Sequence, residues 1–135
     1  MTPPSPISYS SRMHKDEFEI LAEKGLASVP EWFRERLENV DVVIEDEPSH
    51  EMLHRMRVGR GSTLLGLYEG IPLSQRGFYY GNVLPDKITL YMGPILREGG
   101  TPDEIAARVR EVVIHEVGHY FGLSDEELRE LEGRG

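Results

Sequence analysis

The chain has 135 residues, enough for one domain with a single adequate core and too few for two independent cores. Its 24 acidic and 15 basic side chains give a formal net charge of −9, which disfavours nucleic-acid binding because phosphate contacts depend on clustered Lys and Arg. The absence of cysteine excludes disulfides, thiolate zinc ligands and cysteine nucleophiles. Any metal ion must therefore be held by His and carboxylate side chains.

The first segment, residues 1–12, is rich in Pro and Ser and has little to bury, so we expect a flexible tail followed by one domain over residues 13–135. No apolar run resembles a signal-peptide core, and no stretch of about 18 apolar residues could span a membrane. We therefore expect a cytoplasmic protein without membrane association. Its oligomeric state does not follow from the sequence.

Two amphipathic helices are predicted next. Phe18, Leu21 and Ala22 recur at helical spacing within residues 13–26. Ser28 and Glu31 have the spacing of a capping box, which predicts a second helix through residue 37.

The middle of the chain changes to the period of a strand. In residues 40–45 the apolar Val40, Val42 and Ile44 alternate with Asp41, Val43 and Glu45, as in a half-buried strand. Residues 63–68 and 87–92 are also predicted strands, and residues 78–80 a short one.

The last third predicts a long helix. Thr101 is a cap before a proline and an acidic first turn, so the helix should cover residues 102–121 and stop at Gly122. Ser124 with Glu127 then caps a short final helix that ends near residue 131. Helices, strands and helices in this order predict an α+β domain with a small mixed sheet.

The long helix carries the motif HExxH as His115-Glu116-Val117-Gly118-His119. At this spacing the two imidazoles lie one turn apart on one face and can share a metal ion, and Glu116 can take a proton from a water on that ion. Gly122 lets the chain leave the helix and turn back, which would bring Asp125 to the metal as a third ligand.

A second HExxH occurs at His50-Glu51-Met52-Leu53-His54. Arg57 and Arg60 stand where the first copy has Gly122 and Asp125, and two cations would repel a dication. The segment follows a proline and has no helical pattern of its own, so we interpret it as a coincidence on the surface.

The apolar stripe of the long helix gives an independent argument for the first copy. Glu116 projects into the middle of a stripe of core side chains. A carboxylate that faces a core is costly unless it is paired or functional. The stripe consists of Ile105, Val109, Val112, Val113, Val117 and Tyr120.

The extended motif HExxHxxGxxD resembles that of the zincin metallopeptidases, in particular the short bacterial minimal zincins. Two further segments carry the resemblance, LGLYEGIPL at residues 65–73 and LPDKITLYMGPI at residues 84–95. The resemblance implies an active-site helix packed on a small mixed sheet, with an edge strand above the cleft. By order in the chain, that strand would be Lys87 to Met92, and a peptide or protein substrate would add to it as a further strand.

The ligand set predicts zinc held by His115, His119 and Asp125, with an open position for water and with Glu116 as the general base. Peptide-bond hydrolysis is the function expected first. Tyr79, Tyr80 or Tyr91 could donate a hydrogen bond to the transition state, although a plain core or surface role fits each.

Two alternatives stay open. One is a metal-dependent ribonuclease, although such enzymes usually have a third His where this chain has Asp125. The other is a non-catalytic binding module stabilised by zinc, with Glu126, Glu127 or His14 as a fourth ligand. The substrate, the cleavage specificity and the identity of the native metal do not follow from the sequence.

Overall fold

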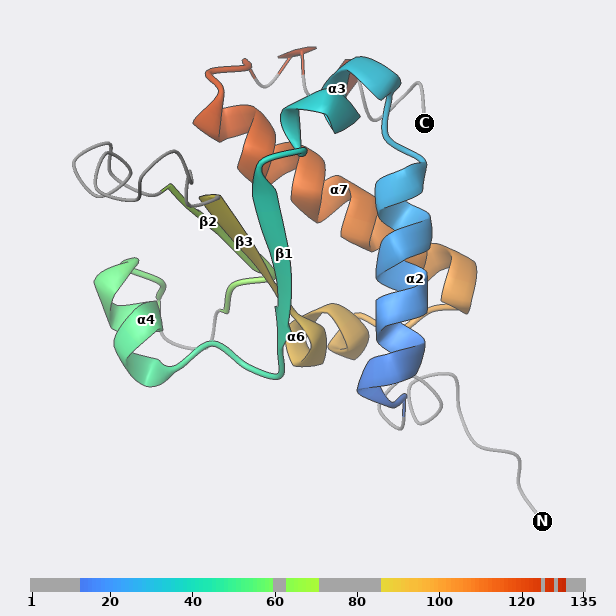
Figure 1. The fold of residues 1–135 in the computed structure, drawn as a ribbon. Helices are drawn as coiled ribbons and strands as arrows, with labels where there is room; N and C mark the ends of the chain where they lie inside the picture. Colours follow the sequence, from blue (N-terminus) through green and yellow to red (C-terminus); the bar gives the residue numbers. More distant parts are fainter. Residues whose placement is uncertain (1–12, 60–62, 71–85, 125, 128, 131–135) are drawn as a thin grey trace, which may run out of the picture.

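A computed structural model describes residues 13–59, 63–70, 86–124, 126, 127, 129 and 130. Within these ranges the helices surround a small mixed sheet, which confirms the expected α+β fold (Figure 1). The elements in chain order are α2 (Lys15–Ala27), α3 (Glu31–Arg36), β1 (Val40–Glu45), α4 (His50–Arg55), β2 (Gly66–Glu69), β3 (Asp86–Tyr91), α6 (Met92–Arg97) and α7 (Pro102–Tyr120).

The sheet has the strand order β1-β3-β2. β1 pairs with β3 in parallel, with Val40 opposite Asp86, and β2 pairs with β3 antiparallel, with Gly66 opposite Leu90. β3 is therefore the central strand and its backbone is hydrogen-bonded on both sides. The prediction that Lys87 to Met92 forms an edge strand open to a substrate is wrong, because neighbours in sequence were taken for neighbours in space. β2 is the edge strand that lies against α7.

The long helix α7 begins as the sequence predicts. Thr101 Oγ1 accepts from the backbone N–H of Glu104 at 3.2 Å, and the Glu104 carboxylate accepts from the backbone N–H of Thr101 at 3.1 Å, a complete capping box. Its buried side packs against α2, so closely that a Cβ atom at Gly25 would lie 2.5 Å from the carbonyl oxygen of Ala106. No helix of the described ranges, α7 included, is long and apolar enough to cross a membrane.

Most of the predicted apolar stripe of α7 lies in the core. The exception is Tyr120, which is 52% exposed and stacks on the ring of Tyr68 with 4.1 Å between the ring centroids. Tyr120 is not buried because it is the last residue of α7 and lies beyond the core. The buried members of the stripe are Ile105, Val109, Val112, Val113 and Val117.

The first two helices form where they were predicted, but the capping box between them does not. Ser28 instead closes α2, and its hydroxyl donates to the carbonyl oxygen of Gly25 at 2.7 Å. α3 begins after Pro30 without a side-chain cap. Proline fixes its own φ, here −56°, and this suffices to turn the chain into the short helix.

The middle of the chain differs from prediction in the bounds of two strands and in the helix α6, which was not expected. β2 begins at Gly66 instead of residue 63, and Met92 begins α6 instead of ending β3. α6 was missed because it is six residues long and contains Pro94, which a first helical turn tolerates. The strand predicted at residues 78–80 and the tail predicted at residues 1–12 lie outside the described residues.

A close contact joins the edge strand to the long helix. A Cβ atom at Gly66 would lie 2.6 Å from Val112 Cγ1 and 3.1 Å from the carbonyl oxygen of Thr89. The absence of a side chain at Gly66 therefore lets the backbone of β2 rest directly on α7.

The capping box makes a prediction about stability. Thr101→Ala removes the acceptor for the first turn of α7, and we expect the free energy of unfolding to fall by about 1 kcal/mol. Chemical denaturation of the variant beside the wild-type protein measures this difference. An unchanged midpoint would show that packing against α2 alone holds the first turn.

The same cap is sensitive to acid. Its hydrogen bond with the Thr101 backbone lowers the pKa of the Glu104 carboxyl, so the charged form stabilises the fold above the ordinary pKa, and this stabilisation is lost as the pH falls through the lowered value. Glu104→Gln keeps an acceptor without the charge. Its stability deficit at neutral pH should therefore shrink as the pH falls below the ordinary Glu pKa of about 4.3, and it should vanish below the lowered pKa of the folded protein.

The contact at Gly66 makes a second prediction. Gly66→Ala should lower the free energy of unfolding by about 1–3 kcal/mol, because the new methyl group meets Val112 and the backbone of β3. Gly59→Ala is the matched control, since no atom lies within 4 Å of a Cβ built there. In the double variant Gly66→Ala with Val112→Ala, the loss in free energy of unfolding should be smaller than the sum of the losses in the two single variants, because the shortened side chain makes room for the methyl group. Strict additivity would contradict the contact.

Candidate functional site

The histidines of the first motif occupy the last turns of α7. His115 is half-buried and His119 is exposed. Their ring centroids are 5.9 Å apart and the ring planes meet at 54°. The two imidazoles thus lie side by side one turn apart, as the spacing predicts.

The separation of the rings can be tested against the reach of a zinc ligand. A zinc ion held by one ring nitrogen at about 2.1 Å lies about 3.2 Å from that ring's centroid, so two rings on one ion are at most about 6.4 Å apart at their centroids. The observed 5.9 Å falls within this limit. A tetrahedral angle corresponds to about 5.2 Å between the centroids, so the two rings would move slightly closer together on an ion. The histidine pair fits a zinc ion.

The chain leaves α7 through the turn that the sequence predicts. Gly122 has φ +80°, the left-handed conformation that glycine adopts most easily. The backbone N–H of Leu123 donates to the carbonyl oxygen of Gly118 at 2.9 Å, and that of Gly122 to His119 at 3.0 Å. These bonds close the helix directly after the second histidine and reverse the chain.

The predicted third ligand, Asp125, lies outside the described residues. Its neighbours Ser124 and Glu127 form the predicted reciprocal cap, with hydrogen bonds of 3.1 and 3.2 Å. The Glu127 carboxylate is thereby engaged with the Ser124 backbone. No group of three potential metal-ligating side chains meets within the described ranges, which leave out Asp125.

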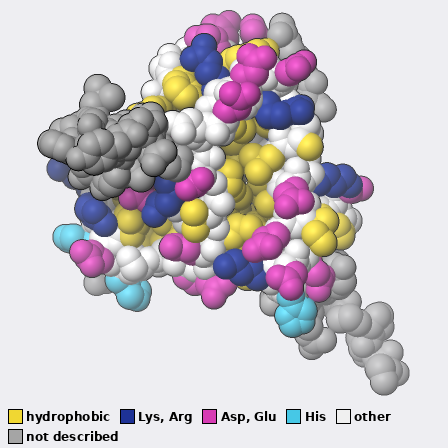
Figure 2. All heavy atoms as spheres, viewed as in Figure 1, with side chains coloured by type: hydrophobic (Ala, Val, Ile, Leu, Met, Phe, Trp, Pro, Cys, Tyr) yellow, Lys and Arg dark blue, Asp and Glu magenta, His cyan; other side chains and the backbone are white. Residues whose placement is uncertain are grey.

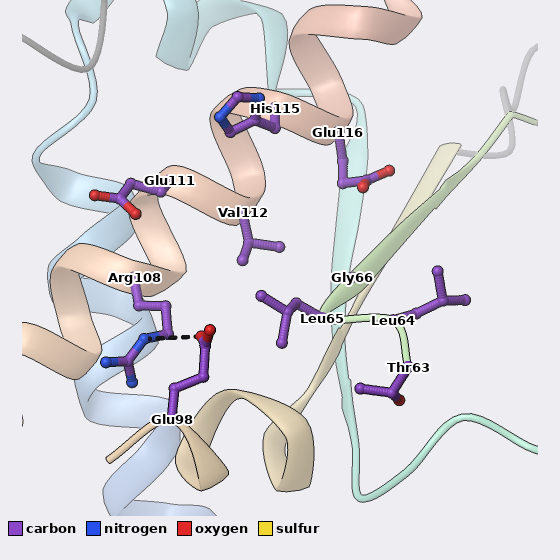
Figure 3. Close-up of a pocket in the computed structure, with 10 residues that line it drawn as sticks. All are labelled: Thr63, Leu64, Leu65, Gly66, Glu98, Arg108, Glu111, Val112, His115 and Glu116. Carbon is purple, nitrogen blue, oxygen red and sulfur yellow. Dashed lines mark ion pairs between the residues drawn. The ribbon is translucent and has the colours of Figure 1, made fainter. Parts of the chain in front are cut away.

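Glu116 projects from α7 toward β2 (Figure 3). It is half-buried, and burial raises the pKa of its carboxyl above the ordinary value; nearby His119 and His115 and a hydrogen bond from the backbone N–H of Tyr68 act in the opposite direction. A carboxylate with a raised pKa is a better proton acceptor near neutral pH. Glu116 is also held by the edge strand, which fixes its direction.

A cleft of about 440 Å³ opens beside these residues, between α7 and the start of β2. At its far end the Arg108 and Glu98 side chains face each other in Figure 3, with 3.1 Å between Nε and Oε2. Arg108 also donates to the carbonyl oxygen of Ile95 at 3.0 Å. The cleft is lined by Thr63, Leu64, Leu65, Gly66, Glu98, Arg108, Glu111, Val112, His115 and Glu116.

Most of these lining residues were given no role in the site by the sequence reasoning, among them Gly66, Glu98 and Arg108. Arg108 precedes His115 by seven residues, or two helical turns, so helical periodicity alone would have put it on the same face. Gly66 carried a weaker signal as the glycine within the LGLYEG segment. Glu98 reaches the cleft only through the tertiary fold and carried no local signal.

The second HExxH forms the exposed helix α4, and none of its residues lines the cleft. The expectation that this segment lacks helical structure is wrong, because Ser49 caps it by accepting from the backbone N–H of Met52 at 3.0 Å. His50 and His54 remain on the surface of the protein. Both copies of the motif are therefore helical. They differ in burial, and only the copy on α7 has residues that line the cleft.

The tyrosines suggested as transition-state donors receive no support from the described residues. Tyr91 is 2% exposed and does not line the cleft. Burial raises the pKa of its hydroxyl, with Glu45 and Glu69 adding to the effect, as for a core residue. Tyr79 and Tyr80 lie outside the described residues.

Comparison with solved structures finds a similar chain. A conserved hypothetical protein from Thermo thermophilus superposes with a TM-score of 0.52 and is 29% identical; the alignment covers 90% of this chain and 100% of the other. No curated protein matches the chain.

The chain also matches a protein family. Residues 37–134, from before β1 to the end of the segment after α7, match the family described as zincin-like metallopeptidase. This range is most of the chain and includes the cleft, the histidine pair and Glu116. The chain therefore belongs to the zincin-like metallopeptidase family, and this membership indicates a hydrolase of the metallopeptidase kind with zinc as its metal.

Proposed function

We propose that the protein is a zinc-dependent peptidase in which His115, His119 and Asp125 hold the metal and Glu116 is the general base. The observation that carries the proposal is the joint geometry of α7: two imidazole rings 5.9 Å apart, beside a half-buried carboxylate that points into a cleft. Family membership agrees with this chemistry.

The donor set suits the metal. Two imidazoles and one carboxylate are a ligand set of catalytic zinc sites, in which a fourth position stays open. Zinc supplies Lewis acidity there and makes an adjacent water more acidic. The exposure of His119 argues against the alternative of a closed structural site, which would have four protein ligands.

Glu116 provides the proton transfer. Its carboxylate accepts a proton from a water in the cleft and returns it to the nitrogen of the leaving amine. The backbone N–H of Tyr68 fixes the direction of the carboxylate, and the raised pKa favours both steps near neutral pH.

The substrate strand belongs at β2. The backbone N–H of Tyr91 donates to the carbonyl oxygen of Leu65 at 3.0 Å, so in this antiparallel pair the backbone groups of Leu65 and Leu67 face β3. Those of Gly66 and Tyr68 face the other way, and Gly66 lines the cleft. An extended peptide that pairs with Gly66 would pass Glu116 and His115, so β2 replaces the strand first expected at Lys87 to Met92.

A substitution of the general base separates chemistry from metal binding. Glu116→Gln should reduce the cleavage of a peptide library at least about 100-fold and leave the zinc content per chain unchanged, because Gln cannot accept the proton. Glu51→Gln, the same change in the second HExxH, is the control and should retain full activity. Wild-type turnover by Glu116→Gln would remove this residue from the mechanism.

The third ligand is tested by metal affinity. Asp125→Asn should weaken zinc binding at least about tenfold in competition with a chromophoric chelator, because a charged ligand becomes neutral. The neighbouring Glu126→Gln controls for the loss of a negative charge in the same segment. Equal affinities of the two variants would exclude Asp125 as a ligand and point to another oxygen donor.

A further inference from the structure

A second hollow lies at the other edge of the sheet, away from β2. It has a volume of about 370 Å³ and separates α2 from β1. Figure 2 shows hydrophobic atoms exposed between these two elements, with acidic and fewer basic side chains around them. We call this surface the β1 groove; it is lined by Lys15, Glu19, Ala22, Glu23, Leu26, Val42, Val43 and Ile44.

The backbone of β1 borders the groove with an edge that has no strand partner within the described ranges. The N–H of Asp86 donates to the carbonyl oxygen of Asn39 at 3.1 Å, and the parallel register pairs Val40 with Asp86. Backbone groups alternate in direction along a strand, so those of residues 39, 41 and 43 face β3. The N–H and C=O groups of Val42 and Ile44 therefore point away from the sheet.

The side chains on this edge are apolar. Val40, Val42 and Ile44 share one face of β1, and Val40 and Ile44 pack against the core. Val42 between them is 37% exposed and lines the groove. Natural edge strands are usually blocked by charged residues, proline or a bulge. On this face β1 has none of them, so it presents both a hydrogen-bonding edge and an apolar surface.

The charges around the groove select its occupant. Of the residues that line the groove, Glu19 and Glu23 on α2 are acidic and Lys15 is basic. Asp41 and Glu45 add two acidic side chains along β1; Lys87 of β3 lies opposite Asp41 in the register, and its ammonium group is 3.6 Å from the Glu69 carboxylate. A second copy of this chain would bring the same acidic groups together, at a net charge of −9 for each copy. A segment with basic side chains would be attracted.

We propose that the β1 groove binds an extended, basic segment of a partner protein, which adds to β1 as a fourth strand. Its apolar side chains on one face enter the groove beside Val42, and its Lys or Arg side chains lie next to the acidic rim. Six residues, about 20 Å of extended chain, match the length of β1. This surface does not depend on the proposed zinc site, because β1 and β2 lie on opposite sides of β3.

The proposal is tested with a short peptide of alternating lysine and valine as the probe. It should bind the wild-type protein and Glu116→Gln equally, and the amides of Val42 and Ile44 should become protected from hydrogen exchange. A peptide in which glutamate replaces lysine should bind at least about tenfold more weakly, and N-methylation of alternate valines should have the same effect.

Two variants test the surface itself. Val42→Pro removes an N–H that faces away from β3, so the ladder remains while the added strand loses a donor; probe affinity should fall about tenfold. Val42→Lys keeps the backbone and puts a cation in the groove, with the same expected loss even if the proline variant fails to fold. Ile20→Lys, a similar change on an exposed part of α2 outside the groove, should bind normally.

Three outcomes would overturn the proposal. The first is equal binding of the lysine and glutamate peptides, and the second is binding that is insensitive to Val42→Lys. The third is self-association of the wild-type protein in sedimentation that Val42→Pro abolishes, which would assign the groove to a second copy of this chain.

Discussion

The close approach of β2 to α7 at Gly66 is the contact on which the site depends. β2 has four residues and pairs with only one strand of the described sheet, so α7 is its other support. Because Gly66 has no side chain, the backbone of β2 comes within reach of Val112 and of Glu116, one turn further along the helix. A side chain at this position would separate the strand from the helix and widen the cleft between them.

The helix α7 both fills the core and carries the histidines of the candidate site. Its first turn is fixed by the Thr101 cap, and its apolar stripe fills the core from Ile105 to Val117. The histidines come only in the last turns, where the negative end of the helix dipole favours a cation. The turn at Gly122 then ends the helix shortly after His119, so His119 is exposed and His115 half-buried while Val117 between them stays in the core.

Local signals allowed the sequence to predict α2, α3, α7 and the spacing of the histidine pair. The spacing of His115 and His119, the cap at Thr101 and the left-handed turn at Gly122 each depend on residues within one or two turns. One group of failures concerns contacts between segments that are distant in the sequence. Strand order depends on pairing between distant segments, so sequence order put an edge at β3, whereas β1 and β2 are the edge strands of the described sheet.

Errors of local prediction arose where two signals competed for one residue. Ser28 has the spacing of a cap for α3, but its hydroxyl donates to Gly25 and ends α2. Met92 continues the strand alternation, but Pro94 two residues later is suited to a first helical turn, and the helix prevails. The position of Glu98 in the cleft could not be predicted from local sequence, because the packing of α6 against α7 brings it to its partner Arg108.

A sheet of three strands has two edges, and this fold treats them differently. The outer edge of β2 faces α7, whose Glu116 accepts the hydrogen bond that the backbone N–H of Tyr68 offers. The edge of β1 has α2 nearby but separated from it by a groove, and the middle residue of the strand is exposed. An apolar edge with unpaired backbone groups favours association with any complementary strand, unless charge selects among the candidates. The acidic side chains around β1 provide that selection, and they do so against a second copy of the same acidic chain.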